Sequence, residues 1–321
     1  MPEISIIMSV FNGGKYLNEA VDSILSQSFN DFEFIIINDC STDNTDEILK
    51  DYSSDPRIKT LTKEQNKGLL GFVENLNTGL NLAQGKYIAR MDADDISSPE
   101  RLKKQFEFLE SHPNIFLVGS SAEKIDENGD LIGYFKAEDS EDKLKKKMLK
   151  WNYIYHPTIM FRNVSGLFYR DKFRGCEDYD FYLRSLSEGK KLINIDEPLL
   201  KYRILKTSVS RSEDTFTRNL LVEKAKEFYF KRLKGIPEEY GLLNPESLKK
   251  VLDFNYKNSE QELLFAARYA WKANNREYLS KILDKTSVFY QSSNNFYLLR
   301  FLNDMPLSIS AISSLLYRKL S

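Results

Sequence analysis

Three carboxylates, those of Asp92, Asp94 and Asp95, lie within four positions directly after the strand-like run 86–90. Carboxylates this close together repel one another unless a cation or a ligand rich in hydrogen-bond donors offsets their charge. In an extended D-x-D the first and third side chains point the same way, so both can face one hard divalent cation. The cluster therefore favours a site for a metal-bound diphosphate. The alternative is an acidic, solvated loop or the start of a helix.

The segments that would position this cluster alternate between strands and helices over the first hundred residues. Nearly continuous apolar runs at 4–10, 32–37, 57–61 and 86–90 predict strands, with helical spacing of apolar residues between them. This order is typical of a doubly wound α/β sheet, which binds ligands outside the carboxyl ends of its strands. The predicted helices span 15–27 and 70–83, with a third that opens within the capping segment 41–46.

Polar residues gather at the carboxyl ends of these predicted strands. Ser9 lies at the end of the first strand and Asp39 ends the second. Asp92 and Asp94 follow the fourth. Because the carboxyl ends of parallel strands meet at one edge of the sheet, we expect these side chains to lie close together. Their coincidence favours a ligand site over an acidic loop.

Beyond residue 100 the pattern is less regular. A mixed-charge run at 136–150 predicts a helix with a solvated face, and 156–161 is an extended apolar run. After about residue 211 strand-like runs end and amphipathic helical patterns continue, which predicts a boundary near 208–215. Other predicted elements are a helix at 99–111, a strand at 115–118 and a helix at 179–188 that Gly189 ends.

The composition limits the class of protein. With 46 basic and 47 acidic residues the net charge is −1, which gives no electrostatic case for nucleic-acid binding. The two cysteines, Cys40 and Cys176, predict no disulfide framework and favour a reducing cytoplasm. The first residues lack the features of a signal peptide, and no run approaches the roughly 18 apolar residues that span a bilayer.

Five segments occur in an order that resembles the family 2 glycosyltransferases of the GT-A fold. They are 5–13, 34–43, 66–68, 89–95 and 177–180. Each is weak alone, and the five in order are specific. The resemblance implies an α/β GT-A fold, a Rossmann-like and mostly parallel sheet flanked by helices. It also implies an inverting sugar transfer from a nucleotide-diphosphate sugar, with Mn²⁺ or Mg²⁺ as cofactor.

The resemblance covers about residues 1–205 and suggests how the chain divides. Residues 1–210 are expected to form the GT-A catalytic domain, with the nucleotide-binding half at 1–100 and the acceptor half at 101–210. The helical patterns make residues 211–321 an all-helical C-terminal region.

The resemblance assigns the nucleotide-sugar to residues at the strand ends. It implies that Asp39 contacts the uracil base and that Ser9 and Phe11 line the nucleotide pocket. Core packing is the alternative for Phe11. Lys67 and Arg90 are expected to contact the diphosphate or the nucleotide, and a surface role is the alternative for Lys67.

The same resemblance divides the acidic cluster by role. Asp92 is expected to meet the ribose or the metal, and Asp94 to be the metal ligand. In some relatives a histidine near the place of His156 completes the metal site, which implies a metal role for His156, and a structural role is the alternative. Asp95 is expected to be a structural neighbour that opens the next helix.

Inversion requires a base on the far side of the sugar from the diphosphate. The resemblance assigns this base to Asp178, at a helix start where the helix dipole favours an ionised carboxylate. Glu177 is the alternative base, or a residue that holds an acceptor hydroxyl. Asp180 is expected to be structural, in an i,i+4 pair with Arg184.

The expected function is transfer of one sugar from a UDP-sugar to a hydroxyl of a glycan or lipid-linked acceptor, in surface polysaccharide biosynthesis. No Gln-x-x-Arg-Trp motif follows Asp178, which predicts a non-processive enzyme. The alternatives are an inactive nucleotide-sugar sensor or scaffold, and a sugar nucleotidyltransferase. Amphipathic stretches at 296–302 and 309–319 predict either peripheral contact with the inner face of a membrane or packing against the catalytic domain or a second subunit.

Overall fold

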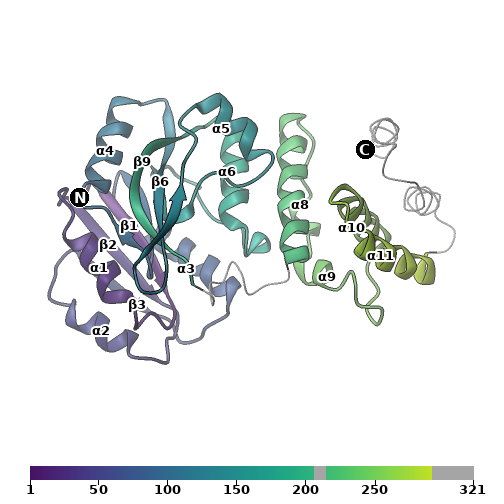
Figure 1. The fold of residues 1–321 in the computed structure, drawn as a ribbon, viewed down its shortest axis with the longest axis horizontal. Coiled ribbons are helices and arrows are strands. Elements are labelled where there is room, and N and C mark those ends of the chain that lie inside the picture. The colour runs from purple at the N-terminus through teal and green to yellow at the C-terminus, as the bar shows by residue number, and fades with distance from the viewer. Residues whose placement is uncertain (206–214, 291–321) are drawn as a thin grey trace. The chain divides into compact units, whose positions relative to one another are not determined.

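The computed structural model describes residues 1–205 and 215–290 (Figure 1). The predicted boundary at 208–215 falls almost entirely outside these residues, and so do the amphipathic stretches at 296–302 and 309–319. Among the described helices, none is long and apolar enough to cross a bilayer. The chain divides into two compact units, Met1–Glu213 with Ala225–Glu238, and Asp214–Lys224 with Glu239–Ser321.

The strands and helices expected in the first hundred residues are present, and the four strands are parallel in the order β3-β2-β1-β4. Ser9 on β1 lies opposite Asp92 on β4, and Val10 lies opposite Asn38 on β2. The polar strand ends therefore meet at one edge of the sheet. The strands are β1 (Ile4–Val10), β2 (Phe32–Asn38), β3 (Ile58–Thr62) and β4 (Tyr87–Asp92), and the helices are α1 (Leu17–Leu25), α2 (Thr45–Asp51) and α3 (Leu69–Leu82).

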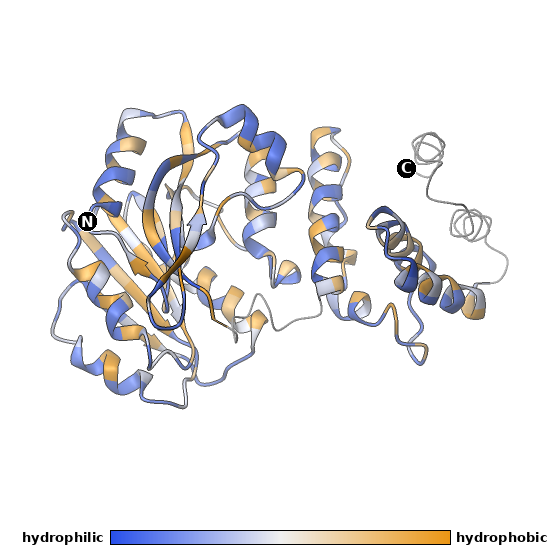
Figure 2. Cartoon of the chain, viewed as in Figure 1, coloured by the Kyte–Doolittle hydropathy of each residue, from blue (hydrophilic) through white to orange (hydrophobic). Residues whose placement is uncertain are grey.

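Helices cover both faces of these strands, which explains why the strand sequences are apolar without alternation. Ile6 and Met8 of β1 belong to the core that includes α1. Ile7 points to the other face, toward α3, where a Cβ added to Gly79 would lie 2.5 Å from Ile7 Cγ2. A glycine at this position is what allows α3 to approach the sheet so closely. Figure 2 shows the resulting hydrophobic strands and amphipathic helices.

The other strands extend the same sheet in mixed directions. β8 lies antiparallel between β4 and β6, and β9 lies parallel to β6. The short β5, directly after the acidic cluster, pairs with β9, and β7 forms a hairpin with β6. The strands are β5 (Ile96–Ser97), β6 (Ile115–Ile125), β7 (Leu131–Phe135), β8 (Met160–Arg162) and β9 (Lys191–Arg203), and the helices are α4 (Arg101–Ser111), α5 (Glu141–Met148) and α6 (Glu177–Ser187).

Two predictions of local backbone structure are wrong. The run 156–161 starts as the 3-10 turn η1 (His156–Thr158), in which the N–H of Thr158 donates to the carbonyl oxygen of Tyr155 at 2.9 Å. Pro157 fixes a φ that suits this turn. Asp95 does not open a helix but leads into β5, because β9 supplies a partner strand there.

The second unit is helical in its described residues. Its longest helices, α10 and α11, lie in contact. Ser259 and Glu262 form a capping box at the start of α10, and Asn275 caps α11. A salt bridge between Lys272 and Glu223 ties α10 to α8. The helices are α8 (Thr215–Leu233), which contributes to both units, α9 (Pro245–Lys249), α10 (Glu260–Lys272) and α11 (Arg276–Phe289).

Asp180 is structural, as expected, but its expected partner is wrong. Arg170 holds it instead: Arg170 Nε donates to Asp180 Oδ2 at 2.8 Å and Nη2 donates to Oδ1. Arg170 Nη1 also donates to Glu238 at 2.7 Å. Asp180 is fully buried, so it lies on the inner face of α6. Arg184 donates to the carbonyl oxygen of Phe168 and lies 4.4 Å over its ring.

Asp180→Asn is expected to destabilise the first unit by about 3–5 kcal/mol, because it leaves the buried charge of Arg170 without a full counter-charge. Equilibrium unfolding in urea measures this loss. Asp46→Asn removes one partner of the exposed Asp46–Lys50 pair and is the matched control, with an unfolding midpoint like that of the wild type. Equal midpoints for both variants would contradict the expectation.

Candidate active site

The first part of the site is the carboxylate of Asp39, directly after β2. Asp39 is 4% exposed, and Asn66 Nδ2 donates to its Oδ2 at 2.9 Å. Its Oδ1 is buried and has no hydrogen-bond partner among the described residues. Since buried polar atoms are almost always paired, this oxygen is suited to accept an N–H from a ligand. The geometry is compatible with the expected contact to a uracil base.

The loops after β1 and β2 hold each other and frame Asp39. Asn12 and Cys40 both have positive φ, 51° and 60°, so each loop has a left-handed residue two positions after its strand ends. The N–H of Thr42 donates to Asn12 Oδ1 at 2.8 Å, and the N–H of Asn12 donates to Ser41 Oγ at 2.9 Å. Phe11 is 51% exposed, so it does not pack in the core. Its ring is available to a ligand at this edge.

The start of α3 closes the other side of Asp39. Asn66 also donates to the backbone oxygen of Asp39, and its own Oδ1 accepts from the N–H of Gly68 at 2.8 Å. A Cβ added to Gly71 would lie 3.1 Å from Asp39 Oδ2, so the helix backbone approaches the carboxylate closely. Lys67 is partly exposed and pairs with Glu74 at 3.0 Å. A diphosphate that binds the ammonium group of Lys67 would therefore have to displace Glu74 from it.

Ser9 is held from α3 as well. Asn75 Nδ2 donates to Ser9 Oγ at 3.1 Å, and the buried Asn75 Oδ1 has no partner among the described residues. The positioning roles of Asn66 and Asn75 were not predicted. The only feature of the sequence that points to Asn66 is its place in the segment 66–68, which carries part of the resemblance.

The acidic cluster forms one group in space. Asp92, Asp94 and Asp95 each offer a carboxylate oxygen, and these oxygens lie within 4.8 Å of one another. Burial, then the charge of Asp92, raises the pKa of Asp94 to about 7. The pKa of Asp95 is raised well above its ordinary value by the same two causes, in the same order, and by the charge of Asp94. These shifts show the repulsion that a bound cation would relieve.

The oxygens of this group suit a hard divalent cation such as Mn²⁺ or Mg²⁺. Asp95 contributes to the group, besides the structural bond that its Oδ1 accepts from the N–H of Arg203 at 2.8 Å. Its Oδ2 is buried without a hydrogen-bond partner among the described residues. The ligand atoms of the cluster therefore fit a divalent cation.

The buried Arg90 interacts with the acidic cluster and also acts on Glu177 and Asp178 at the start of α6. It is 3% exposed and forms an ion pair with Asp92. Its charge also acts on Glu177 and Asp178, where it opposes the upward shift of their pKa values. Its buried Nε has no hydrogen-bond partner among the described residues. Arg90 thus has donor capacity for an anionic ligand.

His156 lies outside the group of three carboxylates. Its Nε2 forms a hydrogen bond with the hydroxyl of Tyr169 at 2.9 Å. Burial, then the charge of Arg90, lowers the pKa of His156 well below its ordinary value, so the imidazole is neutral at pH 7. A neutral imidazole can ligate a metal, and the metal role of His156 stays a prediction.

The second part of the site is the start of α6. Asn152 Nδ2 donates to Asp178 Oδ2 at 2.7 Å, and the N–H of Ile154 donates to Asn152 Oδ1 at 3.1 Å. The second bond orients the amide so that its NH₂ group faces Asp178. Glu177 is 7% exposed, and its Oε2 accepts from the N–H of Gly175 at 2.7 Å. Asn152 was missed because a lone Asn in a loop carries no signal.

Burial outweighs the helix dipole at this helix start, contrary to expectation. It raises the pKa of Asp178, and with the charge of Asp178 it raises the pKa of Glu177 to about 8. Hydrogen bonds from Asn152 and from the N–H of Tyr179 favour the ionised form of Asp178. When the pair holds one proton, we therefore expect it on Glu177, with Asp178 as the ionised member.

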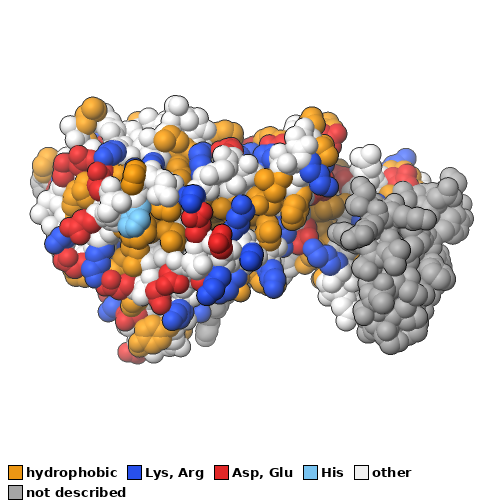
Figure 3. Space-filling model, turned by 90° about the horizontal axis from the view of Figure 1, so that it is seen from above, with side chains coloured by type: hydrophobic (Ala, Val, Ile, Leu, Met, Phe, Trp, Pro, Cys, Tyr) orange, Lys and Arg blue, Asp and Glu red, His pale blue; other side chains and the backbone are white. Residues whose placement is uncertain are grey.

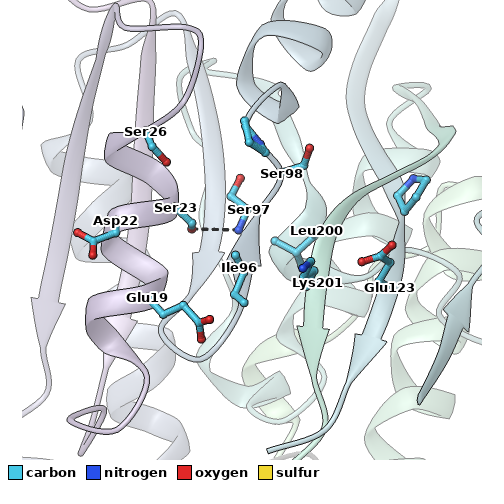
Figure 4. Close-up of a pocket in the computed structure, with 12 residues that line it drawn as sticks. Glu19, Asp22, Ser23, Ser26, Ile96, Ser97, Ser98, Glu123, Leu200 and Lys201 are labelled. Carbon is cyan, nitrogen blue, oxygen red and sulfur yellow. Dashed lines mark hydrogen bonds between the residues drawn. The ribbon is translucent and has the colours of Figure 1, made fainter. Parts of the chain in front are cut away.

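One pocket of the described surface lies away from these residues. It has a volume of about 800 Å³ and lies between α1, β5 and β9, where Ser23 and Ser97 meet through a 3.0 Å hydrogen bond (Figure 4). Glu19 and Lys201 also line it, and none of its lining residues is a predicted site residue. Figure 3 shows acidic and basic side chains interspersed over the face seen from above, in keeping with the net charge of −1.

Comparisons with known proteins agree with this architecture. Residues 5–170 match the family model for glycosyl transferase family 2. The chain is 40% identical over 209 residues to an uncharacterized glycosyltransferase of Methanocaldococcus jannaschii, which covers 63% of this chain and 71% of that protein. It is 38% identical over 217 residues to the O-antigen biosynthesis glycosyltransferase WbnJ of Escherichia coli, which covers 65% of this chain and 82% of WbnJ.

The solved structure of S. aureus TarS 1-349 in complex with UDP-GlcNAc resembles this one, with a TM-score of 0.58 and 17% identity over 96% of this chain and 77% of that chain. The sheet, the helices and this likeness define a GT-A fold. The chain belongs to glycosyl transferase family 2, and it is a glycosyltransferase. The alternative of a sugar nucleotidyltransferase is therefore set aside.

Proposed function

We propose that the protein transfers a single sugar, with inversion at the anomeric carbon, from a UDP-sugar to a hydroxyl of a glycan or lipid-linked saccharide in surface polysaccharide biosynthesis. The observation that carries the proposal is the two-part site. The carboxylate of Asp39, which can accept a hydrogen bond from a nucleotide base, and the three clustered carboxylates lie at one edge of the sheet. The charge of the buried Arg90 acts on Glu177 and Asp178 at the start of α6. The UDP-GlcNAc complex of TarS supports the donor class, and the name of WbnJ supports the acceptor class.

In this proposal the donor binds along the carboxyl ends of β1, β2 and β4. Asp39 accepts from the uracil, Ser9 and Phe11 line the nucleotide, and Lys67 and Arg90 contact the diphosphate. Asp92 contacts the ribose or the metal.

Asp94 is the main ligand of the proposed cation, and Asp92 and Asp95 offer further oxygens in the same group. His156 is a proposed further ligand. A bound Mn²⁺ or Mg²⁺ would supply positive charge to offset the charge that grows on the departing UDP.

Asp178 is the proposed base. As the acceptor oxygen attacks the anomeric carbon and the bond to the diphosphate breaks, Asp178 takes the proton of the acceptor hydroxyl. Asn152 keeps the carboxylate of Asp178 oriented, and Glu177 carries the proton that the pair retains near neutral pH.

Asp39→Ala is expected to weaken UDP binding by about 10- to 100-fold, the effect of losing a hydrogen bond to a charged group. Calorimetric titration with UDP and with GDP, both with Mn²⁺, measures this and tests the base preference of the wild type. Asp51→Asn, on the exposed side of α2, is the matched control and is expected to bind like the wild type. Tighter binding of GDP than UDP by the wild type would contradict the proposed donor.

A further inference from the structure

We infer that Arg203, the last residue of β9, is a positioning residue that presets the acidic cluster for its cation. The inference rests on the proposed metal site. Arg203 Nε donates to the backbone oxygen of Asp94 at 2.8 Å, and the N–H of Arg203 donates to Asp95 Oδ1 at 2.8 Å. Arg203 thus holds Asp95 through its own main-chain N–H and Asp94 through its own side chain.

Arg203 is itself fixed by two other segments. Its side chain is 2% exposed and forms an ion pair with Glu19 of α1. Its Nη1 donates to the backbone oxygen of Asp126, in the β6–β7 hairpin, at 3.2 Å. The guanidinium lies 4.4 Å over the ring of Tyr16, whose hydroxyl donates to the backbone oxygen of Glu127 at 3.1 Å. The orientation of Arg203 is therefore set before any ligand binds.

The contacts of Arg203 leave the carboxylate of Asp94 available. Arg203 reaches only the backbone oxygen of Asp94, so its fork of N–H donors fixes the position of Asp94 without blocking a metal ligand. The pairing of β5 with β9 holds the next two residues, Ile96 and Ser97. Asp94 and Asp95 repel each other in a buried setting, and these contacts keep them together at the geometry a cation needs.

Lysine is not an equivalent residue here. Arginine presents five N–H donors in one plane, and Arg203 uses them toward Asp94, Asp126 and Glu19 on three separate segments. The ammonium of a lysine is a single point that cannot reach all three. Loss of a residue that orients metal ligands typically lowers metal affinity by about 10- to 100-fold.

The test compares Arg203→Lys with Arg162→Lys. Arg162 is a matched control because it also donates to backbone oxygens, those of Ile115 at 2.8 Å and Leu109 at 2.7 Å, away from the acidic cluster. Electron paramagnetic resonance of free Mn²⁺ gives the Mn²⁺ Kd of each variant in the presence of UDP. Thermal unfolding without metal gives the stability of each variant.

Arg203→Lys is expected to raise the Mn²⁺ Kd by about 10-fold or more. Its turnover should recover at high Mn²⁺ concentration, and its metal-free unfolding temperature shows how much lost stability contributes. Arg162→Lys is expected to lower the unfolding temperature and leave the Mn²⁺ Kd unchanged. Tyr16→Leu, which removes the ring beneath the guanidinium, is a second variant in case Arg203→Lys does not fold, and it is expected to raise the Mn²⁺ Kd.

The possible results separate this inference from the proposed function. An unchanged Mn²⁺ Kd in Arg203→Lys, or in Tyr16→Leu if Arg203→Lys does not fold, would overturn the inference alone. An equal rise in Arg162→Lys would also overturn it, because the effect would then follow from lost stability. A wild type that does not bind Mn²⁺ would overturn the proposed metal site and the inference with it.

Discussion

Asp178→Asn is expected to lower the rate of sugar transfer by about 10³-fold, because general base catalysis contributes roughly 10²- to 10⁴-fold. The amide has the shape of the carboxylate and keeps an oxygen that can accept from Asn152, so the fold and donor binding should be retained. It cannot take the proton of the acceptor hydroxyl. Single-turnover kinetics with donor and acceptor measure the loss, and calorimetric titration with UDP checks that the donor still binds.

Glu177→Gln is the matched comparison for this experiment. Burial raises the pKa of Glu177 to about 8, so its carboxyl is mostly protonated at pH 7 and a neutral amide resembles it. This variant should keep most of the transfer rate. If Glu177→Gln lost the rate and Asp178→Asn kept it, the base would be Glu177.

The dependence on pH follows from the same assignment. A base must be ionised, so the wild-type rate should rise with pH as Asp178 loses its proton, across a pKa that burial has raised. The residual rate of Asp178→Asn should lack this rise. A pH profile of kcat from pH 5 to 9 provides the measurement, and an identical rise in the variant would contradict the assignment.

Asp94→Asn is expected to lower transfer by about 10³-fold, which corresponds to about 4 kcal/mol of lost charge stabilisation. The variant also should not gain thermal stability from Mn²⁺, whereas a bound cation raises the unfolding temperature of the wild type by mass action. Asp51→Asn serves again as the matched control and should respond to Mn²⁺ like the wild type. An active Asp94→Asn enzyme that binds Mn²⁺ normally would refute the role of Asp94.

Stability without metal separates this loss of function from misfolding. The pKa of Asp94 is raised to about 7 in the folded protein, from an ordinary value of 3.8. Between these values the folded state binds more protons than the unfolded state, so the contribution of Asp94 to stability falls as pH rises from about 4 to about 7. Asp94→Asn removes this contribution, so above pH 7 the metal-free variant should be at least as stable as the metal-free wild type.

The sequence was sufficient to predict the nucleotide-binding half of the sheet because its strands are buried on both faces. β2, with all seven residues buried, is the clearest example: its largely apolar run is short, which favours a strand over a helix. β9 was not predicted. It carries Asp196, Glu197 and Pro198 in its middle, and it forms because β6 and β5 supply partners.

In the site, too, some residues can be recognised from the local sequence, and others depend on partners far away along the chain. The carboxylates of Asp39, Asp94 and Asp178 stand at recognisable positions after a strand or at a helix start. Asn152 and Arg203 do not, because their roles depend on bonds to residues 26 and 108 positions away. The predicted Asp180–Arg184 pair is a similar case. Helical spacing makes this pair possible, but Arg170, from outside the helix, binds Asp180 instead.

The proposed positioning of the acidic cluster by Arg203 has a consequence for biosynthesis of the protein. Domains fold as the chain leaves the ribosome, N-terminal segments first. A nascent chain exposed only to residue 150 contains Asp39 and the whole acidic cluster, but it lacks both Arg203 and Asp178. With the proposed roles of Arg203 and Asp178, sugar transfer therefore requires that β9 has been made and inserted.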